Sequence, residues 1–225
     1  MDTLLVEIRA GEGGNDAKLL VEQQLTIYTR YAKRKGLELE LVDVQPGAAT
    51  VRVRGRGAAE AFAREAGGHR WQRVPPTERR GRVHSSTVTV AVLREPRPHE
   101  VRLDPADLKF ERYRASGPGG QHRNTTDSAV RVTHLPTGLQ ATAETKSQHR
   151  NRELALAVLR ARVQAEQERT QRVQRDHARK TQVGTGMRAD KVRTVAEQRG
   201  RVENHLNGRR IALRSYLRGD LDGLL

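Results

Sequence analysis

The residues best suited to chemistry lie in a glycine-rich segment, SGPGGQHRNTTDS, at positions 116–128. Gly119 and Gly120 tolerate positive φ angles and let the backbone approach a ligand closely, and Pro118 fixes its own φ. The next residue, Gln121, carries an amide that cannot act as a base but can hold a water or an alcohol, and its backbone N–H can donate to developing negative charge. This pattern indicates catalysis by positioning and oxyanion stabilisation.

Two simpler interpretations of this segment stay open at this point. Gly, Pro and Ser fill ordinary hairpin loops, so the glycines alone are compatible with a plain turn. An acid–base or nucleophilic enzyme would need a partnered Ser, His or carboxylate, and His122 has no orienting acid at a recognisable spacing. The surroundings favour a loop that meets a polyanion, because residues 109–152 hold eight Lys or Arg against three Asp or Glu.

The composition of the whole chain points the same way. Its 225 residues include 42 Lys or Arg and 27 Asp or Glu, a formal net charge of +15, and nucleic acid is the commonest partner of such a charge. A membrane partner is disfavoured, because uninterrupted apolar runs such as Val90–Leu93 are far too short to span a bilayer. The first residues also lack the apolar core of a signal peptide. There is no Cys, hence no disulfide or thiolate metal site. We expect a cytoplasmic protein without metal or cofactor.

The elements that must position the glycine-rich loop can be read from the periodicity. Apolar spacing predicts strands at 3–11, 37–44, 49–55 and 87–93, with 37–44 half-buried, and helices at 15–35 and 58–67. Asn15 is the expected N-cap of the first helix and Gly36 its stop. This order predicts an α+β fold in which helices cover a sheet.

A proline-rich connector at 94–109 leads to a second module. Strands are expected at 110–116, 129–135 and 138–144 around the glycine-rich loop. A long helix follows from Ser147, with an apolar stripe of Leu156, Leu159 and Val163, and the sequence TQVGTG at 181–186 breaks it. The predicted domains are 1–100, an α/β sandwich; 101–183, a smaller α+β domain with the long helix; and 184–225, a C-terminal segment packing on the first domain.

Two stretches, RASGPGGQHRNTTDSAVRVTHLPTG and KSQHRNRELALAVLRARV, resemble the peptidyl-tRNA hydrolysis module of class I bacterial peptide chain release factors. In that family the loop enters the ribosomal peptidyl transferase centre and promotes attack of water on the ester that joins peptide to tRNA. The resemblance implies that Gly119, Gly120 and Gln121 carry this reaction, which takes place only together with the ribosome. It also implies that a glutamine methyltransferase modifies the amide of Gln121.

The first strand and its glycines, EIRAGEGGNDAKLL, resemble the opening of the family's decoding domain. A dinucleotide-binding loop is the alternative, but its fingerprint needs a third glycine where this chain has Asp16. In the release factor interpretation, Gly13 and Asp16 lie at the first base of the stop codon. The family usually has Glu at the latter position.

The segment GGHRWQRVPPTERRGRVHSSTVTVAVL resembles the family's codon-reading region. Its Pro-x-Thr tripeptide, Pro75 to Thr77, is the form found in factors that read UAA and UAG. Arg79 and Arg80 depart from the small or polar residues usual there and are candidates for phosphate contacts or altered codon reading. The resemblance assigns codon contacts to these further positions: Gln72 and Ser85 at the third base, and His84 stacking at the second.

The resemblance covers nearly the whole sequence, including RKTQVGTGMRADKVRTV and GDLDGLL of the family's closing region, but not its N-terminal helical domain. It implies stop-codon-dependent translation termination, with the rRNA of both ribosomal subunits, the mRNA stop codon and P-site peptidyl-tRNA as partners. Two alternatives remain: a rescue factor that releases peptides from stalled ribosomes without normal codon dependence, and a non-catalytic RNA-binding protein. The basic region 178–212 keeps the first alternative open, whereas the intact Gly-Gly-Gln opposes the second.

Overall fold

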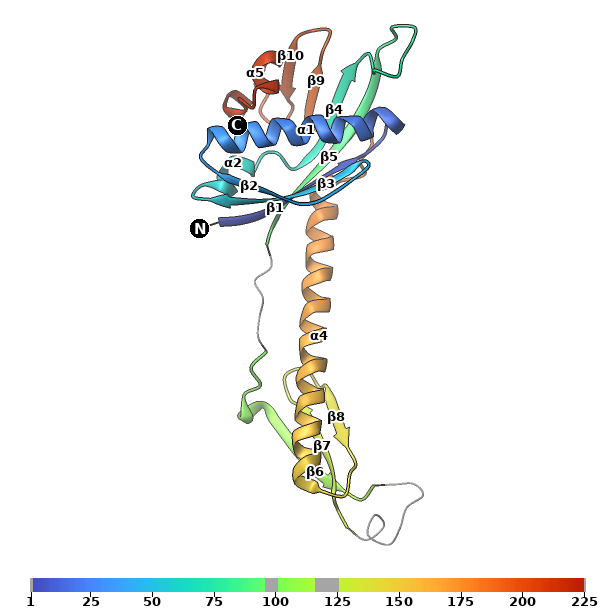
Figure 1. Cartoon of the computed structure of the whole chain (residues 1–225), viewed down its shortest axis with the longest axis vertical. Helices are drawn as coiled ribbons and strands as arrows, with labels where there is room; N and C mark the ends of the chain where they lie inside the picture. The colour runs from blue at the N-terminus through green and yellow to red at the C-terminus, as the bar shows by residue number, and fades with distance from the viewer. Residues whose placement is uncertain (1, 96–100, 116–125, 225) are drawn as a thin grey trace. The chain divides into compact units, whose positions relative to one another are not determined.

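The computed structural model describes residues 2–95, 101–115 and 126–224. The chain divides into two compact units, one made of residues 1–96 with 175–225 and the other of residues 97–174. Both combine helices with antiparallel strands (Figure 1), so the predicted α+β class is confirmed. In the part of the chain that is described, no helix is both long and apolar enough to cross a membrane.

The first unit is built on an eight-stranded sheet with the strand order β11-β10-β9-β4-β5-β1-β3-β2. Neighbouring strands run antiparallel except β4 and β9, which are parallel. The strands are β1 (Asp2–Ala10), β2 (Glu38–Gln45), β3 (Ala48–Gly55), β4 (Gly67–Arg73), β5 (His84–Arg94), β9 (Arg193–Ala196), β10 (Arg201–Asn204) and β11 (Arg210–Ala212).

Helix α1 (Gly14–Arg34) lies across this sheet (Figure 1) and buries its apolar stripe against it. The helix was predicted at 15–35, and Gly36 ends it as expected, with a left-handed φ of 66°. The predicted N-cap was wrong: Asn15 is already helical, and Gly13 takes the cap position without any side-chain cap hydrogen bond. The residues buried on the inner face at helical spacing are Ala17, Leu20, Val21, Gln24, Ile27, Tyr28 and Tyr31.

Three features of the first unit differ from the sequence-based prediction. Strand β4 was not predicted, and β5 begins at His84 rather than at 87. Strand β2 was expected to be half-buried but is mostly exposed, because it lies at the edge of the sheet. The C-terminal region contributes three strands that were not predicted, β9, β10 and β11, together with the short helix α5 (Leu213–Leu217) and a 3-10 turn at Asp222–Leu224. The other short helix, α2 (Ala58–Phe62), was predicted.

The second unit packs a three-stranded sheet against the first half of a long helix, α4 (Gln148–Val183). Its strands are β6 (Leu108–Tyr113), β7 (Ala129–His134) and β8 (Gln140–Ala143), in the order β6-β7-β8, with a 3-10 turn at Pro105–Asp107 before them. The core joins Val132 and Ala141 of the sheet to Leu159 and Val163 of the helix, and Leu156 is partly buried beside them. Gly184 ends the helix with φ 63°.

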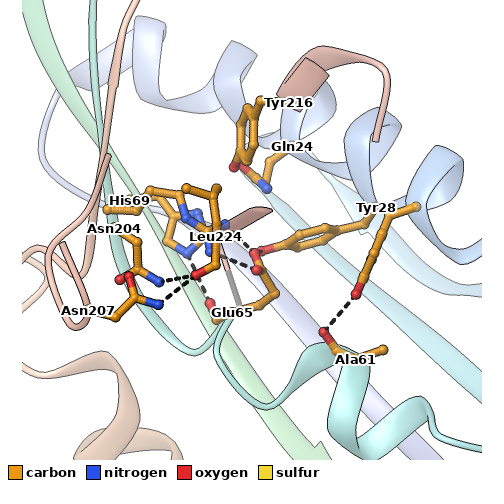
Figure 2. Close-up of polar contacts among 11 residues, drawn as sticks. Gln24, Tyr28, Ala61, Glu65, His69, Asn204, Asn207, Tyr216 and Leu224 are labelled. Carbon is orange, nitrogen blue, oxygen red and sulfur yellow. Dashed lines mark hydrogen bonds and ion pairs between the residues drawn. The ribbon is translucent and has the colours of Figure 1, made fainter. Parts of the chain in front are cut away.

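A buried polar network fastens the C-terminal strands to the rest of the first unit (Figure 2). Glu65 accepts from Arg193 Nη2 at 2.7 Å and from the Tyr28 hydroxyl at 2.9 Å, and both charged side chains are almost fully buried. Burial alone would raise the pKa of Glu65, but the adjacent Arg193 guanidinium outweighs it and holds that pKa below its ordinary value. The ion pair therefore connects β9 to the segment before β4.

Candidate nucleic-acid interface

The hairpin formed by β4 and β5 carries most of the predicted codon contacts. Gln72 and Ser85 are direct partners in the β4–β5 register, so their side chains leave the same face of the sheet next to each other. Arg73 and His84 form the next pair and, because side chains alternate along a strand, point to the opposite face. The hairpin therefore presents an amide and a hydroxyl on one face and an imidazole on the other.

The ten residues that connect the two strands contain the predicted tripeptide. The Glu78 N–H donates to the Pro75 carbonyl at 3.0 Å and closes a four-residue turn with Pro76 as its second residue, a position that suits proline. Pro75 is buried, whereas Thr77 is exposed. The turn thus anchors its first residue and presents the threonine hydroxyl to solvent. Arg79 and Arg80, which follow it, are also exposed.

Asp16 in the first turn of α1 is held by the hairpin. Arg73 donates to Asp16 Oδ1 through Nη2 at 2.6 Å and through Nε at 3.0 Å, and its Nη1 donates to Gln23 Oε1 at 2.8 Å. The Asp16 and Arg73 side chains are only 5% and 9% exposed. The carboxylate predicted to meet the first codon base is therefore occupied in connecting α1 to the end of β4, whereas Asn15 beside it is exposed.

Gly13 is required by close packing as well as by its backbone angle. Its φ is 139°, and a Cβ placed on it would lie 2.6 Å from the Cβ of Ser86 in β5. The N-terminus of α1 can therefore approach β5 only with glycine at this position. This brings the first predicted contact next to the strand that carries Ser85 and His84.

Glu78, which sequence reasoning did not select, is the anchor of the connecting loop. Its carboxylate accepts from the Arg80 backbone N–H at 2.7 Å, from Arg82 Nη2 at 2.9 Å and from His84 Nε2 at 2.9 Å. The Arg80 N–H first, and then the Arg82 guanidinium, hold the pKa of Glu78 below its ordinary value. A signal was present in the sequence, because Glu78 is the one carboxylate between residues 66 and 94, a stretch rich in arginine.

The predicted catalytic residues Gly119, Gly120 and Gln121 lie outside the described residues. Two sets of contacts lie at the described residues that flank this segment. Asn151 of α4 is fully buried; its Nδ2 donates to the carbonyls of Ser128 and Thr145 at 2.8 and 2.9 Å, and its Oδ1 accepts from the Thr145 N–H at 2.7 Å. Arg114 and Asp127 form an exposed ion pair across the two ends of the segment. Sequence reasoning missed Asn151 because nothing local distinguishes it from a solvent-facing polar residue.

Comparison with known proteins identifies two family models and a set of relatives. A family model described as the PCRF domain matches residues 1–90, and one described as the RF-1 domain matches residues 97–206. Proteins named peptide chain release factor 1 from Methylibium petroleiphilum and Ruegeria pomeroyi are 47% and 43% identical, each over 98% of this chain and over 64% and 65% of their own lengths.

Among solved structures, RF2 of Thermus thermophilus is similar with a TM-score of 0.58 and 39% identity, over 99% of this chain and 66% of that chain. The chain thus spans just under two thirds of the length of the proteins that it matches. Two adjoining family models and an alignment over nearly all of its residues lead to one conclusion: this chain belongs to the peptide chain release factor family.

Proposed function

We propose that this protein acts in translation termination, where it promotes hydrolysis of the peptidyl-tRNA ester when a stop codon occupies the ribosomal decoding site. The first unit reads the codon and the second brings the glycine-rich loop to the peptidyl transferase centre. Its partners are the ribosome, the mRNA stop codon and P-site peptidyl-tRNA, all in the cytoplasm. The observation that carries the proposal is the β4–β5 hairpin, which gathers Gln72, Ser85, His84 and the Pro75–Thr77 turn on one support.

The chemistry of this hairpin suits UAA and UAG. At the third base, the amide of Gln72 and the hydroxyl of Ser85 can each donate or accept, so the pair can serve the hydrogen-bonding edge of adenine or of guanine. The exposed Thr77 hydroxyl belongs to the turn that begins at Pro75. The ring of His84, on the other face of the hairpin, offers a surface on which an unpaired base can stack, as single-stranded RNA recognition often requires.

For the chemical step we propose Gly119, Gly120 and Gln121. They fall within the stretch 97–206 that matches the RF-1 domain. The Gln121 backbone N–H would stabilise the oxyanion of the ester carbonyl, and its side chain would hold the attacking water. Methylation of the Gln121 amide by a glutamine methyltransferase belongs to the same proposal.

Release of a labelled peptide from programmed ribosomes tests the function. We expect efficient release with UAA and UAG in the decoding site, and release slower by roughly 10- to 100-fold with UGA or a sense codon, the effect of one or two lost hydrogen bonds in a desolvated site. Equal release on UAA, a sense codon and an empty site would instead indicate a rescue factor.

A substitution in the glycine-rich segment tests the second unit separately. Gly120→Ala should abolish release, because a Cβ restricts the φ range and prevents close approach of the backbone to the ester. Binding of the factor to ribosomes programmed with UAA should stay within about twofold of the unaltered protein, because the decoding unit is unchanged. Gly138→Ala is the control: this glycine lies in the β7–β8 turn and has φ 69°, with open space around it. Release by Gly120→Ala at the unaltered rate would contradict the site.

A further inference from the structure

The exposed ring of His84 contacts a buried carboxylate, that of Glu78. The His84 side chain is 44% exposed, whereas the Glu78 side chain that contacts its Nε2 at 2.9 Å is only 6% exposed. An ionised carboxylate has no proton to donate, so the imidazole must donate through Nε2–H. This contact fixes both the orientation of the ring and the position of its proton, and it leaves Nδ1 as the free nitrogen of the neutral imidazole.

The same residue also shapes the turn that presents Thr77. The Glu78 backbone N–H closes the turn to Pro75 at 3.0 Å, and its Oε1 accepts from the Arg80 N–H at 2.7 Å. On the other side, Oε2 accepts from Arg82 as well as from His84. One residue therefore connects the two parts of the hairpin that face the codon in the proposed function: its backbone N–H closes the Pro75–Thr77 turn, and its side chain contacts the first residue of β5.

We propose that Glu78 is a positioning residue for codon reading, which acts through His84 by fixing the ring and its Nε2–H tautomer before the codon binds. This inference rests on the proposed function. A ring that is already ordered loses less freedom when a base stacks on it, so the contribution of Glu78 should be found in codon affinity. The chemical step should be unaffected, because the carboxylate touches no reacting atom.

The experiment measures release on UAA-programmed ribosomes as a function of factor concentration for the full chain. Glu78→Ala should raise the half-saturating concentration by roughly 10-fold, the loss of one charge-assisted hydrogen bond, with the saturated rate within about twofold of the unaltered protein. Glu78→Gln should stay within about threefold, because its amide oxygen still accepts from Nε2–H. Glu60→Gln, which removes an exposed charge from α2, is the control for net charge and should change nothing.

A double-mutant cycle separates positioning from a general structural role. If Glu78 acts through His84, the variant that combines Glu78→Ala with His84→Ala should be no worse than His84→Ala alone. The inference would be overturned if the effects of the two substitutions on the half-saturating concentration multiplied in the double variant. It would also be overturned if Glu78→Ala lowered only the saturated rate, or if Glu78→Gln and Glu78→Ala raised the half-saturating concentration equally.

Nitrogen NMR of the free protein labelled in its histidine rings gives a test independent of release. At about pH 8, where an ordinary imidazole is neutral, His84 should carry its proton on Nε2, and Glu78→Ala should produce a mixture of the two tautomers. The same tautomer mixture in the unaltered protein would overturn the inference. If the unaltered protein releases peptide equally with and without a stop codon, the proposed function is contradicted. The NMR result still decides whether Glu78 positions the His84 ring.

Discussion

His69 is a fully buried histidine that the structure keeps neutral. Its Nε2–H donates to the Glu65 carbonyl at 2.9 Å (Figure 2), and burial, together with the nearby Arg193 charge, lowers its pKa to about 4. The unfolded chain gives the same residue a pKa of about 6.5. At a pH between these two pKa values, His69 therefore binds a proton in the unfolded state but not in the folded state.

This difference predicts acid destabilisation of the first unit. The free energy of unfolding should fall as the pH drops from about 6.5 to about 4, by about 3 kcal/mol at most from His69, and the lowered pKa of Glu65 should add a further loss in more acid solution. Urea unfolding followed by fluorescence of Trp71, the one tryptophan, measures it. His69→Gln, which can donate but does not titrate, should show a flatter dependence; equal slopes would contradict this assignment.

The last two turns of α4 are anchored to the sheet of the first unit by side chains. Arg179 donates to both carboxylate oxygens of Glu7 in β1, at 2.7 and 2.6 Å, and the Gln182 amide both donates to the Val92 carbonyl and accepts from its N–H. The Glu7 side chain is only 8% exposed. A buried carboxylate that loses its main partner carries a desolvation cost.

Arg179→Ala should therefore lower the stability of the first unit by about 1–3 kcal/mol, measured by Trp71 fluorescence in urea. The control is Arg169→Ala on the same helix. Its partner Glu166 lies one turn away on the helix surface, and an exposed pair of this kind contributes no more than about 0.5 kcal/mol. Equal losses in the two variants would contradict a specific anchor.

Sequence periodicity was sufficient for elements whose pattern is local. Helix α1 and strands β1, β3, β6, β7 and β8 follow from apolar spacing alone. Strand β4 does not, because Gly67, Gly68 and Arg70 lack strand character and its structure depends on pairing with β5 and β9, which lie elsewhere in the chain. Asn151 escaped prediction because its contacts with Ser128 and Thr145 exist only in the folded unit. Glu78 is different, since its partners are near in sequence and its position as the one carboxylate in an arginine-rich stretch was a usable signal.

The net charge of +15 should dominate how the whole molecule associates with its partner. If Lys and Arg contact phosphates of ribosomal RNA, binding releases counterions, and affinity should fall by roughly tenfold for every two phosphates contacted between about 50 and 200 mM salt. Ribosome binding measured across that range gives the number of contacts. An affinity that does not change with salt would contradict an interface made mainly with phosphates.

The parallel pairing of β4 with β9 also has a consequence for the order in which the protein is made. Strand β4 ends at Arg73, and its partner begins at Arg193, about 120 residues later. At about 5–20 residues per second, synthesis of that interval takes roughly 6–24 s. During that time Glu65 has no ion pair with Arg193, and Trp71 lacks the neighbours that β9 and α5 supply. The unit whose sequence starts first therefore finishes folding last, and the nascent chain must keep an unpaired strand edge from aggregating until then.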